Sequence, residues 1–355
     1  MQQRGLTIDG TTVGDDTRCY VIAEIGHNHQ GDVEQCKKLF AAARECGANA
    51  VKLQKRDNRT LFTRIMYASP YASDHAFGDT YGTHREALEF GRDEYLELKA
   101  YAAEIGVTFF STAFDIASAD FLADLDVPAY KLASGDLRSI PLLRHIAAFG
   151  KPMIISTGGG TMDDVRRAYD TIMPINSQLC IMQCTAGYPP EFSELNLRVI
   201  ETYRDEFRDI VIGFSSHDNG IAMPLVAYML GARIVEKHFT LNRAMKGSDH
   251  AFSLEPPGLR RLVRDLGRTV DSLGDGVKRV YPSEHKPLFK MAKKLVAARD
   301  LPAGTVLTAA DIVMKTPNDG ISPVHYDDLL GRRLLMPMRA DETFSLESLQ
   351  AASAA

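Results

Sequence analysis

Two lysines of this sequence stand inside apolar segments, where a charged side chain needs a partner. They are Lys52 in AVKLQ and Lys131 in AYKLAS, and an unpaired ammonium group is costly to bury. A structural interpretation gives each lysine one ion-pair partner, Glu24 or Glu236. A functional interpretation has both lysines converge on the phosphate or carboxylate of an anionic substrate, with nearby hydroxyl groups as further donors. These hydroxyl groups belong to Ser134, Ser156 and Ser215.

Two histidines end apolar segments, His217 after VIGFSS and His238 in IVEKH. If these segments are neighbouring strands, the two imidazoles can share a divalent cation that water and substrate oxygens complete. The alternative is a pair of hydrogen-bonded histidines in a polar pocket. Zinc-finger spacing is absent, so a structural zinc is not expected. The histidines of HNHQ, at 27–30, are expected to be surface or hydrogen-bonding residues.

The elements that must position these residues form a regular series. Short apolar segments alternate with helical periodicity, and eight βα units in one series predict a (β/α)8 barrel. The alternative, a doubly wound sheet, needs a GxGxxG loop after its first strand, and EIGHNHQGD lacks one. The predicted strands are Tyr20–Ile25, Ala50–Gln54, Val107–Thr112, Ala129–Ala133, Met153–Thr157, Leu179–Cys184, Val211–Ser215 and Arg233–Lys237.

Polar residues gather at the ends of these predicted strands. A barrel strand buried on both faces should be apolar, whereas side chains at its C-terminal end face the active site. Every predicted strand contributes at least one polar residue there, which predicts an active site at that end of the barrel. These residues include Glu24, Lys52, Gln54, Ser111, Thr112, Lys131, Ser134, Ser156, Thr157, Cys184, Tyr188, Ser215, His217, Glu236 and His238.

The pattern changes after Gly274. Residues 281–292 carry two prolines and mixed charge, which is typical of a linker. Residues 293–355 show short strands and Pro/Gly turns but no helix of barrel length, which predicts a small, mostly β module. Such a module has a marginal core of its own. The expected organisation is therefore a catalytic barrel at 1–280, a linker at 281–292 and a β module at 293–355.

Composition excludes several classes of protein. The chain has 355 residues, of which 45% are hydrophobic, and a net charge of −5 without any long basic run. A nucleic-acid partner is therefore not expected. No apolar run reaches the length of a membrane span. The five irregularly spaced cysteines indicate a reducing compartment, so we expect a cytoplasmic protein.

Several stretches together resemble the N-acetylneuraminate (sialic acid) synthase family. The resemblance covers essentially the whole chain, and the C-terminal module resembles the antifreeze-like (SAF) domain of such synthases. It implies a TIM barrel followed by a SAF domain. The stretches are AEIGHNHQGD, VKLQK, FFSTAFD, PAYKLASGDL, KPMIISTGGG, QCTAGYP, IGFSSHD, EKHFTL and KGSDHAFSLEP.

The resemblance also implies an activity. The family condenses phosphoenolpyruvate with an open-chain N-acylhexosamine, typically N-acetylmannosamine, or with its 6-phosphate. The products are a nine-carbon 2-keto-3-deoxy acid and phosphate, formed by C–O cleavage. The implied assembly is a homodimer in which the SAF domain caps the partner barrel. Two alternatives are a metal-dependent barrel aldolase or isomerase and a non-catalytic carbohydrate-binding protein.

The same resemblance assigns roles to residues of this chain. Mn2+ or Mg2+ is expected at His217 and His238. Phosphoenolpyruvate is expected at Lys52, Lys131, Ser134, Ser156 and Ser215. The expected sugar contacts are Gln54, Thr112, Tyr188 and Asp249, with Lys315 and Phe289 from the tail. The expected catalytic residues are Glu24, Asp136 and Glu236.

Three positions depart from the family pattern, the first being Ala186, where an asparagine often follows Cys-Thr. Ser216 stands where an aspartate commonly precedes the first metal ligand, which removes a carboxylate from behind it. Thr316 stands where many bacterial members carry a tail arginine; Lys315 is adjacent, but lysine does not replace arginine in a bidentate contact. The identity of the sugar, and whether it is phosphorylated, stays open.

Overall fold

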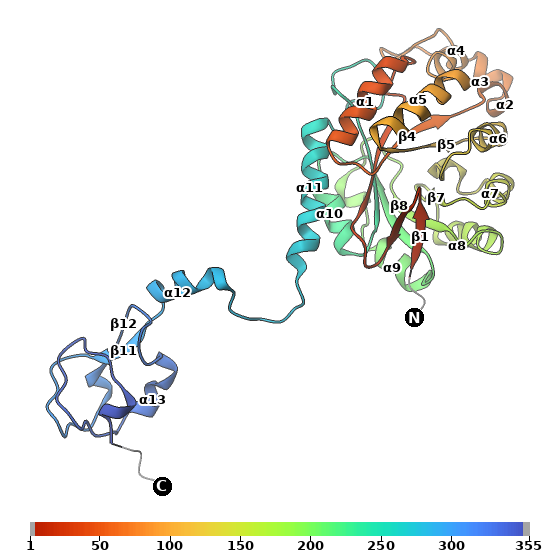
Figure 1. Ribbon diagram of the computed structural model, residues 1–355. Coiled ribbons are helices and arrows are strands. Elements are labelled where there is room, and N and C mark those ends of the chain that lie inside the picture. The colour runs from red at the N-terminus through yellow and green to blue at the C-terminus, as the bar shows by residue number, and fades with distance from the viewer. Residues whose placement is uncertain (1–3, 351–355) are drawn as a thin grey trace. The chain divides into compact units, whose positions relative to one another are not determined.

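The computed structural model describes residues 4–350, and the chain divides into two compact units (Figure 1). The first unit ends at Gly274 and the second begins at Asp275. Residues 281–292, expected to be a linker, contain the 3-10 turn η3 (Pro282–Glu284) and helix α12 (His285–Met291). The last five residues of the module expected at 293–355 lie outside the described part of the chain.

The first unit is a closed barrel of parallel strands in the order β10-β3-β4-β5-β6-β7-β8-β9. The pairing of His238 with Glu24 closes it between β10 and β3. Each strand overlaps a predicted one, so the predicted (β/α)8 barrel is confirmed and the doubly wound alternative is wrong. The strands are β3 (Tyr20–Gly26), β4 (Ala50–Lys55), β5 (Thr108–Ala113), β6 (Tyr130–Leu132), β7 (Met153–Ser156), β8 (Leu179–Cys184), β9 (Val211–Ser216) and β10 (Ile234–His238).

Helices surround these strands in the first unit (Figure 1). Carboxylate caps begin several of them: Asp32 accepts from the backbone of Gln35, and Asp115 from that of Ser118. Gly106, with φ of 70°, ends α5 in the left-handed conformation that glycine adopts readily. The helices are α1 (Val33–Glu45), α2 (Asn58–Leu61), α3 (Arg64–Ala68), α4 (Tyr81–Glu86), α5 (Arg92–Ile105), α6 (Ile116–Asp124), α7 (Ile140–Ala147), α8 (Met162–Ile172), α9 (Val199–Glu206), α10 (Ala222–Met229) and α11 (Pro256–Leu273).

An N-terminal hairpin precedes the barrel and was not predicted. Its strands β1 (Gly5–Ile8) and β2 (Thr11–Gly14) pair antiparallel. Leu6, Ile8 and Val13 are buried and belong to the same hydrophobic core as the barrel strands. The hairpin therefore extends the barrel core.

The second unit contains a small antiparallel sheet of β11 (Lys294–Ala297) and β12 (Ile312–Lys315). Short turns and the short helices α12 and α13 (Tyr326–Leu329) accompany it, which confirms the predicted small β module. Within residues 4–350, no helix is both long and apolar enough to cross a bilayer. The remaining elements are η4 (Ala309–Asp311), η5 (Pro323–His325) and η6 (Leu346–Ser348), and the core includes Leu295, Leu301, Leu307, Leu329, Leu334 and Phe344.

Candidate active site

A cavity of about 550 Å³ lies where the barrel strands end. Each of the eight barrel strands contributes at least one lining side chain, as expected for a barrel active site. Most of the residues predicted from strand ends therefore share one cavity. Those that line it are Glu24, Lys52, Gln54, Thr112, Lys131, Ser134, Ser156, Cys184, Tyr188, Ser215, His217, Glu236 and His238, together with Asp249.

The two buried lysines have different partners. The Nζ atom of Lys52 lies 2.6 Å from Glu24 Oε2 and 3.5 Å from Glu236 Oε1, so Lys52 has both of the ion-pair partners considered from the sequence. The Nζ atom of Lys131 instead donates to Ser156 Oγ at 2.6 Å and to the carbonyl of Leu132 at 3.0 Å. Among residues 4–350, no carboxylate lies within 4.0 Å of it.

The electrostatics of Lys131 follow from this arrangement. Burial lowers the pKa of its ammonium group, and the negative charge of Glu236 opposes that shift. Lys131 is only 2% exposed. A buried cation without a close counter-ion is costly unless an anion arrives. Lys131 thus fits the interpretation in which a buried lysine binds the phosphate or carboxylate of a substrate.

Two buried carboxylates flank the lysines. Glu24 accepts a hydrogen bond from Gln54 Nε2 at 2.7 Å in addition to its ion pair with Lys52. Glu236 is buried, which would raise its pKa, but the charges of Lys131 and Lys52 outweigh burial and lower that pKa. Its Oε2 atom has no hydrogen-bond partner among the described residues. Glu236 therefore remains a carboxylate with one oxygen available for a substrate.

The two histidines predicted to hold a metal are neighbours, with ring centroids 5.3 Å apart. The carbonyl of Thr185 accepts from His217 Nδ1 at 3.1 Å, which leaves a lone pair on Nε2. Burial and then the proximity of His238 lower the pKa of His217 to about 3, so its ring is neutral, the form that binds metals. The Nδ1 atom of His238 is buried without a hydrogen-bond partner among residues 4–350.

These properties fit a divalent cation held by two imidazoles. No group of three or more His, Cys, Asp or Glu side chains suited to a metal occurs in the described residues. Water and substrate oxygens would therefore complete the coordination, as expected from the sequence. Aromatic rings fix the imidazoles: Tyr188 lies 4.0 Å from His217 and Phe252 lies 5.0 Å from His238, between ring centroids.

Ser216, which stands where the family commonly has an aspartate, contacts the carboxylate of Asp218. Its hydroxyl donates a hydrogen bond to Asp218, which also pairs with Lys237 at 3.1 Å. Both members of that ion pair are 1% exposed. A charged pair therefore lies behind strand β9, next to His217.

Three of the residues expected to have a catalytic or sugar-binding role lie outside the cavity lining, as do Ser111 and Thr157 from the strand ends. Asp136 follows Ser134 in the 3-10 turn η1 (Ser134–Asp136) and accepts from Ser139 Oγ at 3.0 Å, and burial raises its pKa to about 6. Lys315 and Phe289 belong to the second unit; Lys315 pairs with Asp341, and Phe289 is 50% exposed. Their roles toward a sugar stay predictions.

Several lining residues were not predicted as site residues. His27 belongs to HNHQ and was expected to be a surface or hydrogen-bonding residue, but it lines the cavity. Arg56 continues the alternation of Lys52 and Gln54 along β4, which is a signal that could have identified it. Arg85 comes from helix α4 in the insertion, the long segment of residues 56–107 between β4 and β5, where no periodicity points to the barrel. Tyr71, Phe114, Ser248 and Phe252 were missed as well.

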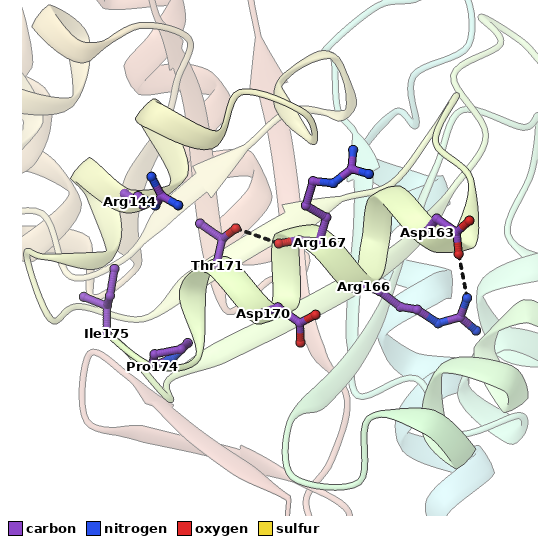
Figure 2. Close-up of a pocket in the computed structure, with 8 residues that line it drawn as sticks. All are labelled: Arg144, Asp163, Arg166, Arg167, Asp170, Thr171, Pro174 and Ile175. Atoms are coloured by element: carbon purple, nitrogen blue, oxygen red, sulfur yellow. Dashed lines mark hydrogen bonds and ion pairs between the residues drawn. The ribbon is translucent and has the colours of Figure 1, made fainter.

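A second cavity, also of about 550 Å³, lies on helices α7 and α8 (Figure 2). Its charged side chains are largely paired with one another or with neighbours: Arg166 binds Asp163 at 2.8 Å and Glu206 at 2.5 Å. It lies away from the strand ends and has no nucleophile or metal-binding set among its lining residues. It is therefore a surface depression between helices.

The fold and the polar cavity define a (β/α)8-barrel enzyme whose active site takes an anionic substrate. More specifically, the chain belongs to the NeuB family, whose model matches residues 39–278, and a SAF domain matches residues 294–350. Both findings confirm the resemblance seen in the sequence motifs.

Named relatives cover nearly the whole chain. N-acetylneuraminate-9-phosphate synthase of Mus musculus is 41% identical over 97% of this chain and 96% of its own. N,N'-diacetyllegionaminic acid synthase of Legionella pneumophila is 34% identical over 95% and 96%. The crystal structure of N-acetylneuraminic acid synthetase from Leptospira borgpetersenii, in complex with citrate, superposes with a TM-score of 0.70 at 29% identity, covering 81% of this chain and 96% of that one.

Proposed function

We propose that this enzyme condenses phosphoenolpyruvate with N-acetylmannosamine or a related N-acylhexosamine, giving a nine-carbon 2-keto-3-deoxy acid and phosphate. The observation that carries the proposal is Lys131, a buried cation that lacks a carboxylate partner within 4.0 Å among the described residues and donates to Ser156 at 2.6 Å. Relatives named as synthases of N-acetylneuraminate 9-phosphate and of diacetyllegionaminic acid support the same reaction class.

The residues of the cavity divide between the two substrates. Lys131 and Lys52 would hold the anionic groups of phosphoenolpyruvate, with hydroxyl donors from Ser134, Ser156 and Ser215. A Mn2+ or Mg2+ ion bound by His217 and His238 would orient and polarise the sugar aldehyde as a Lewis acid. The side chains proposed to position the sugar are Gln54, Thr112, Tyr188 and Asp249.

Proton transfer and charge stabilisation fall to the carboxylates. Glu24, held by Lys52 and Gln54, would move a proton at the aldehyde oxygen or at the attacking water. When carbon 3 of phosphoenolpyruvate attacks the aldehyde, carbon 2 becomes cationic. The available oxygen of Glu236 would stabilise that charge until water adds. The tetrahedral intermediate then collapses with cleavage of the C–O bond, and phosphate leaves.

The proposal also includes the location of the enzyme in the cell and its assembly. The enzyme would act in the cytoplasm, consistent with five free cysteines in the structure. It would form a homodimer in which each SAF domain caps the partner barrel and presents Lys315 and Phe289 to the sugar. Asp136 would assist catalysis from beside Ser134.

The test combines the two substrates with Mn2+ and measures phosphate release and product mass. Phosphoenolpyruvate carrying 18O in its bridging oxygen should deliver the label to inorganic phosphate. An aldolase or isomerase would act without phosphoenolpyruvate, and a carbohydrate-binding protein would release no phosphate. Label retained in the sugar product would contradict C–O cleavage.

A further inference from the structure

A buried ion pair lies next to the two histidines of the proposed metal site. Asp218 directly follows His217, and Lys237 directly precedes His238. The Nζ atom of Lys237 lies 3.1 Å from Asp218 Oδ1 and also donates to the backbone carbonyl of Asp218 at 2.5 Å. The pair thus joins the two chain segments that carry the histidines.

This ion pair lies outside the cavity. Glu236 and His238 of strand β10 line the cavity. Successive side chains of a strand point to opposite faces, so Lys237, which stands between them, points away from the cavity. His217 lines the cavity as well, whereas its neighbour Asp218 does not. Neither member of the pair is therefore placed to touch a substrate.

The burial of these two charges has an energetic cost. The outer face of a barrel strand packs against helices and is ordinarily apolar. The side chains of Lys237 and Asp218 are each only 1% exposed, and Asp218 Oδ2 has no hydrogen-bond partner among residues 4–350. Replacing a buried ion pair by apolar residues of similar volume is often neutral or stabilising. Stability of the fold alone therefore does not explain the pair.

The regular pairing of strands β9 and β10 stops just before the histidines. Its last register pair is Ser216 with Lys237, and β9 itself ends at Ser216. His217 lies beyond this pairing, so the pairing does not fix its distance from His238. The bond from Lys237 Nζ to the carbonyl of Asp218 joins the two segments one residue after His217. The lysine side chain thus continues the connection where the strand pairing ends.

Ser216 holds the same carboxylate. Its hydroxyl donates to Asp218 Oδ1, the oxygen that also accepts from Lys237. Ser216 Oγ in turn accepts from the backbone N–H of Asp218 at 3.4 Å. The residues on both sides of His217 are therefore bonded to each other and to β10.

We infer that the Lys237–Asp218 ion pair is a positioning device for the metal site. It ties the segment that carries His217 to the strand that carries His238, and so sets the spacing of the two imidazoles, whose ring centroids are 5.3 Å apart. A functional site has to be held to within about 0.5 Å of its working geometry. The inference rests on the proposed metal site and deepens it: Lys237 and Asp218 act through the histidines, and neither would contact the ion.

The test measures Mn2+ affinity directly, by calorimetry on folded protein without substrates. The variant Lys237→Met/Asp218→Asn removes both charges together and leaves no buried charge unpaired, so it should stay folded. Its Mn2+ affinity should fall about tenfold, the smaller of the losses found when residues behind metal ligands are replaced. A pair with a structural role alone would leave Mn2+ binding by this folded variant at the wild-type level.

A second measurement separates a local effect on the histidines from a distortion of the whole barrel. Phosphoenolpyruvate binding without metal should change little in the double variant, because Lys131 and Ser156 belong to strands β6 and β7. Equal losses of Mn2+ and phosphoenolpyruvate affinity would overturn the inference.

The matched control is Asp15→Asn/Arg204→Met. It neutralises an ion pair of 2.7 Å whose two members do not line the cavity. The control should leave Mn2+ affinity unchanged, and a loss as large as that of the double variant would show a general effect of removing ion pairs.

The outcomes also separate this inference from the proposed function. If the wild type binds no Mn2+, the proposed metal site is wrong and the inference with it. If the wild type and the folded double variant bind Mn2+ equally well, the metal site stands and the positioning role is wrong.

Asp218→Asn is a milder second variant. It keeps the bond from Lys237 to the backbone carbonyl and should weaken Mn2+ binding less than the double replacement does. If the double variant does not fold, unchanged Mn2+ affinity in Asp218→Asn overturns the inference.

Discussion

Lys52 forms a 2.6 Å ion pair with Glu24 across the neighbouring strands β4 and β3. Lys131, two strands farther around the barrel, donates instead to the hydroxyl of Ser156. From the sequence, the same two interpretations applied to both lysines, an ion pair or contact with an anionic substrate, since each stands in an apolar strand. The structure separates them into a lysine that is already paired and one that lacks a close carboxylate partner.

The first prediction follows from this difference. Lys52→Met would leave the buried Glu24 without its ion-pair partner and should lower the free energy of unfolding by about 3–5 kcal/mol. Lys131→Met removes no such ion pair and should cost clearly less stability, while phosphoenolpyruvate binding weakens strongly. Denaturant unfolding and calorimetry with phosphoenolpyruvate measure the two effects. Equal stability losses, or unchanged phosphoenolpyruvate binding by Lys131→Met, would contradict this assignment.

The second prediction concerns the metal. Chelation should abolish turnover and Mn2+ should restore it, because His217 and His238 supply the two imidazoles of the proposed site. Replacing either histidine by alanine should reduce Mn2+ affinity at least about tenfold, as measured by calorimetry on folded protein. His145→Ala is a matched control, since His145 pairs with Asp120 on the outer helices at 2.6 Å. Full turnover in chelator would remove the metal from the mechanism.

Much of the fold was predictable because parallel barrel strands are continuous apolar runs. The hairpin β1–β2 was not predicted, since each of its strands has only four residues and offers too short a pattern. No helix was predicted between Arg56 and Gly91, a polar stretch of the sequence. It contains the short helices α2, α3 and α4, which are too short and too polar to show a helical pattern of apolar residues.

The residues of the active site, too, could be predicted only in part. Residues at strand ends, such as Glu24 and Lys131, could be predicted because strand position alone brings them to one end of the barrel. Arg85 and Tyr71 could not be, since they reach the cavity only through the tertiary folding of the insertion. The sequence likewise does not show whether a carboxylate lies close enough to pair with a buried lysine, because that distance is set by the folded structure.

The third prediction concerns pH and uses His29, which is buried and stacked on Phe90 with ring centroids 4.1 Å apart. Burial lowers its pKa to about 3, whereas an unfolded histidine titrates near pH ~6.5. Between these values the unfolded chain binds a proton that the folded chain does not. Stability should therefore fall as pH falls, by up to about 1.4 kcal/mol per pH unit from this residue.

His29→Gln removes that proton and should make the dependence of stability on pH shallower. Urea unfolding of both proteins between ~pH 6 and ~pH 5 measures the two slopes. The comparison cancels groups common to both proteins, including Asp136, whose raised pKa acts in the opposite direction. Identical slopes would show that His29 is protonated equally in the folded and unfolded states.

The last prediction concerns the second unit, which has a small core and begins at Asp275. The barrel cavity is open and polar, so a cover would exclude water and add donors to the sugar. A chain ending at Gly274 should keep the barrel core, because the residues of that core and those packed against it end at Val270. Its circular dichroism should show a folded barrel, while most of the condensation activity should be lost.

Complementation distinguishes a cover supplied by the partner from one supplied by the same chain. A Lys131→Met chain has an inactive barrel and an intact SAF domain; the chain ending at Gly274 has an active barrel and no SAF domain. If the domain acts on the partner, heterodimers should recover activity that neither chain has alone, because the intact SAF domain covers the intact barrel. Light scattering that shows a monomer, or mixtures without gain after subunit exchange has been demonstrated, would contradict the partner arrangement.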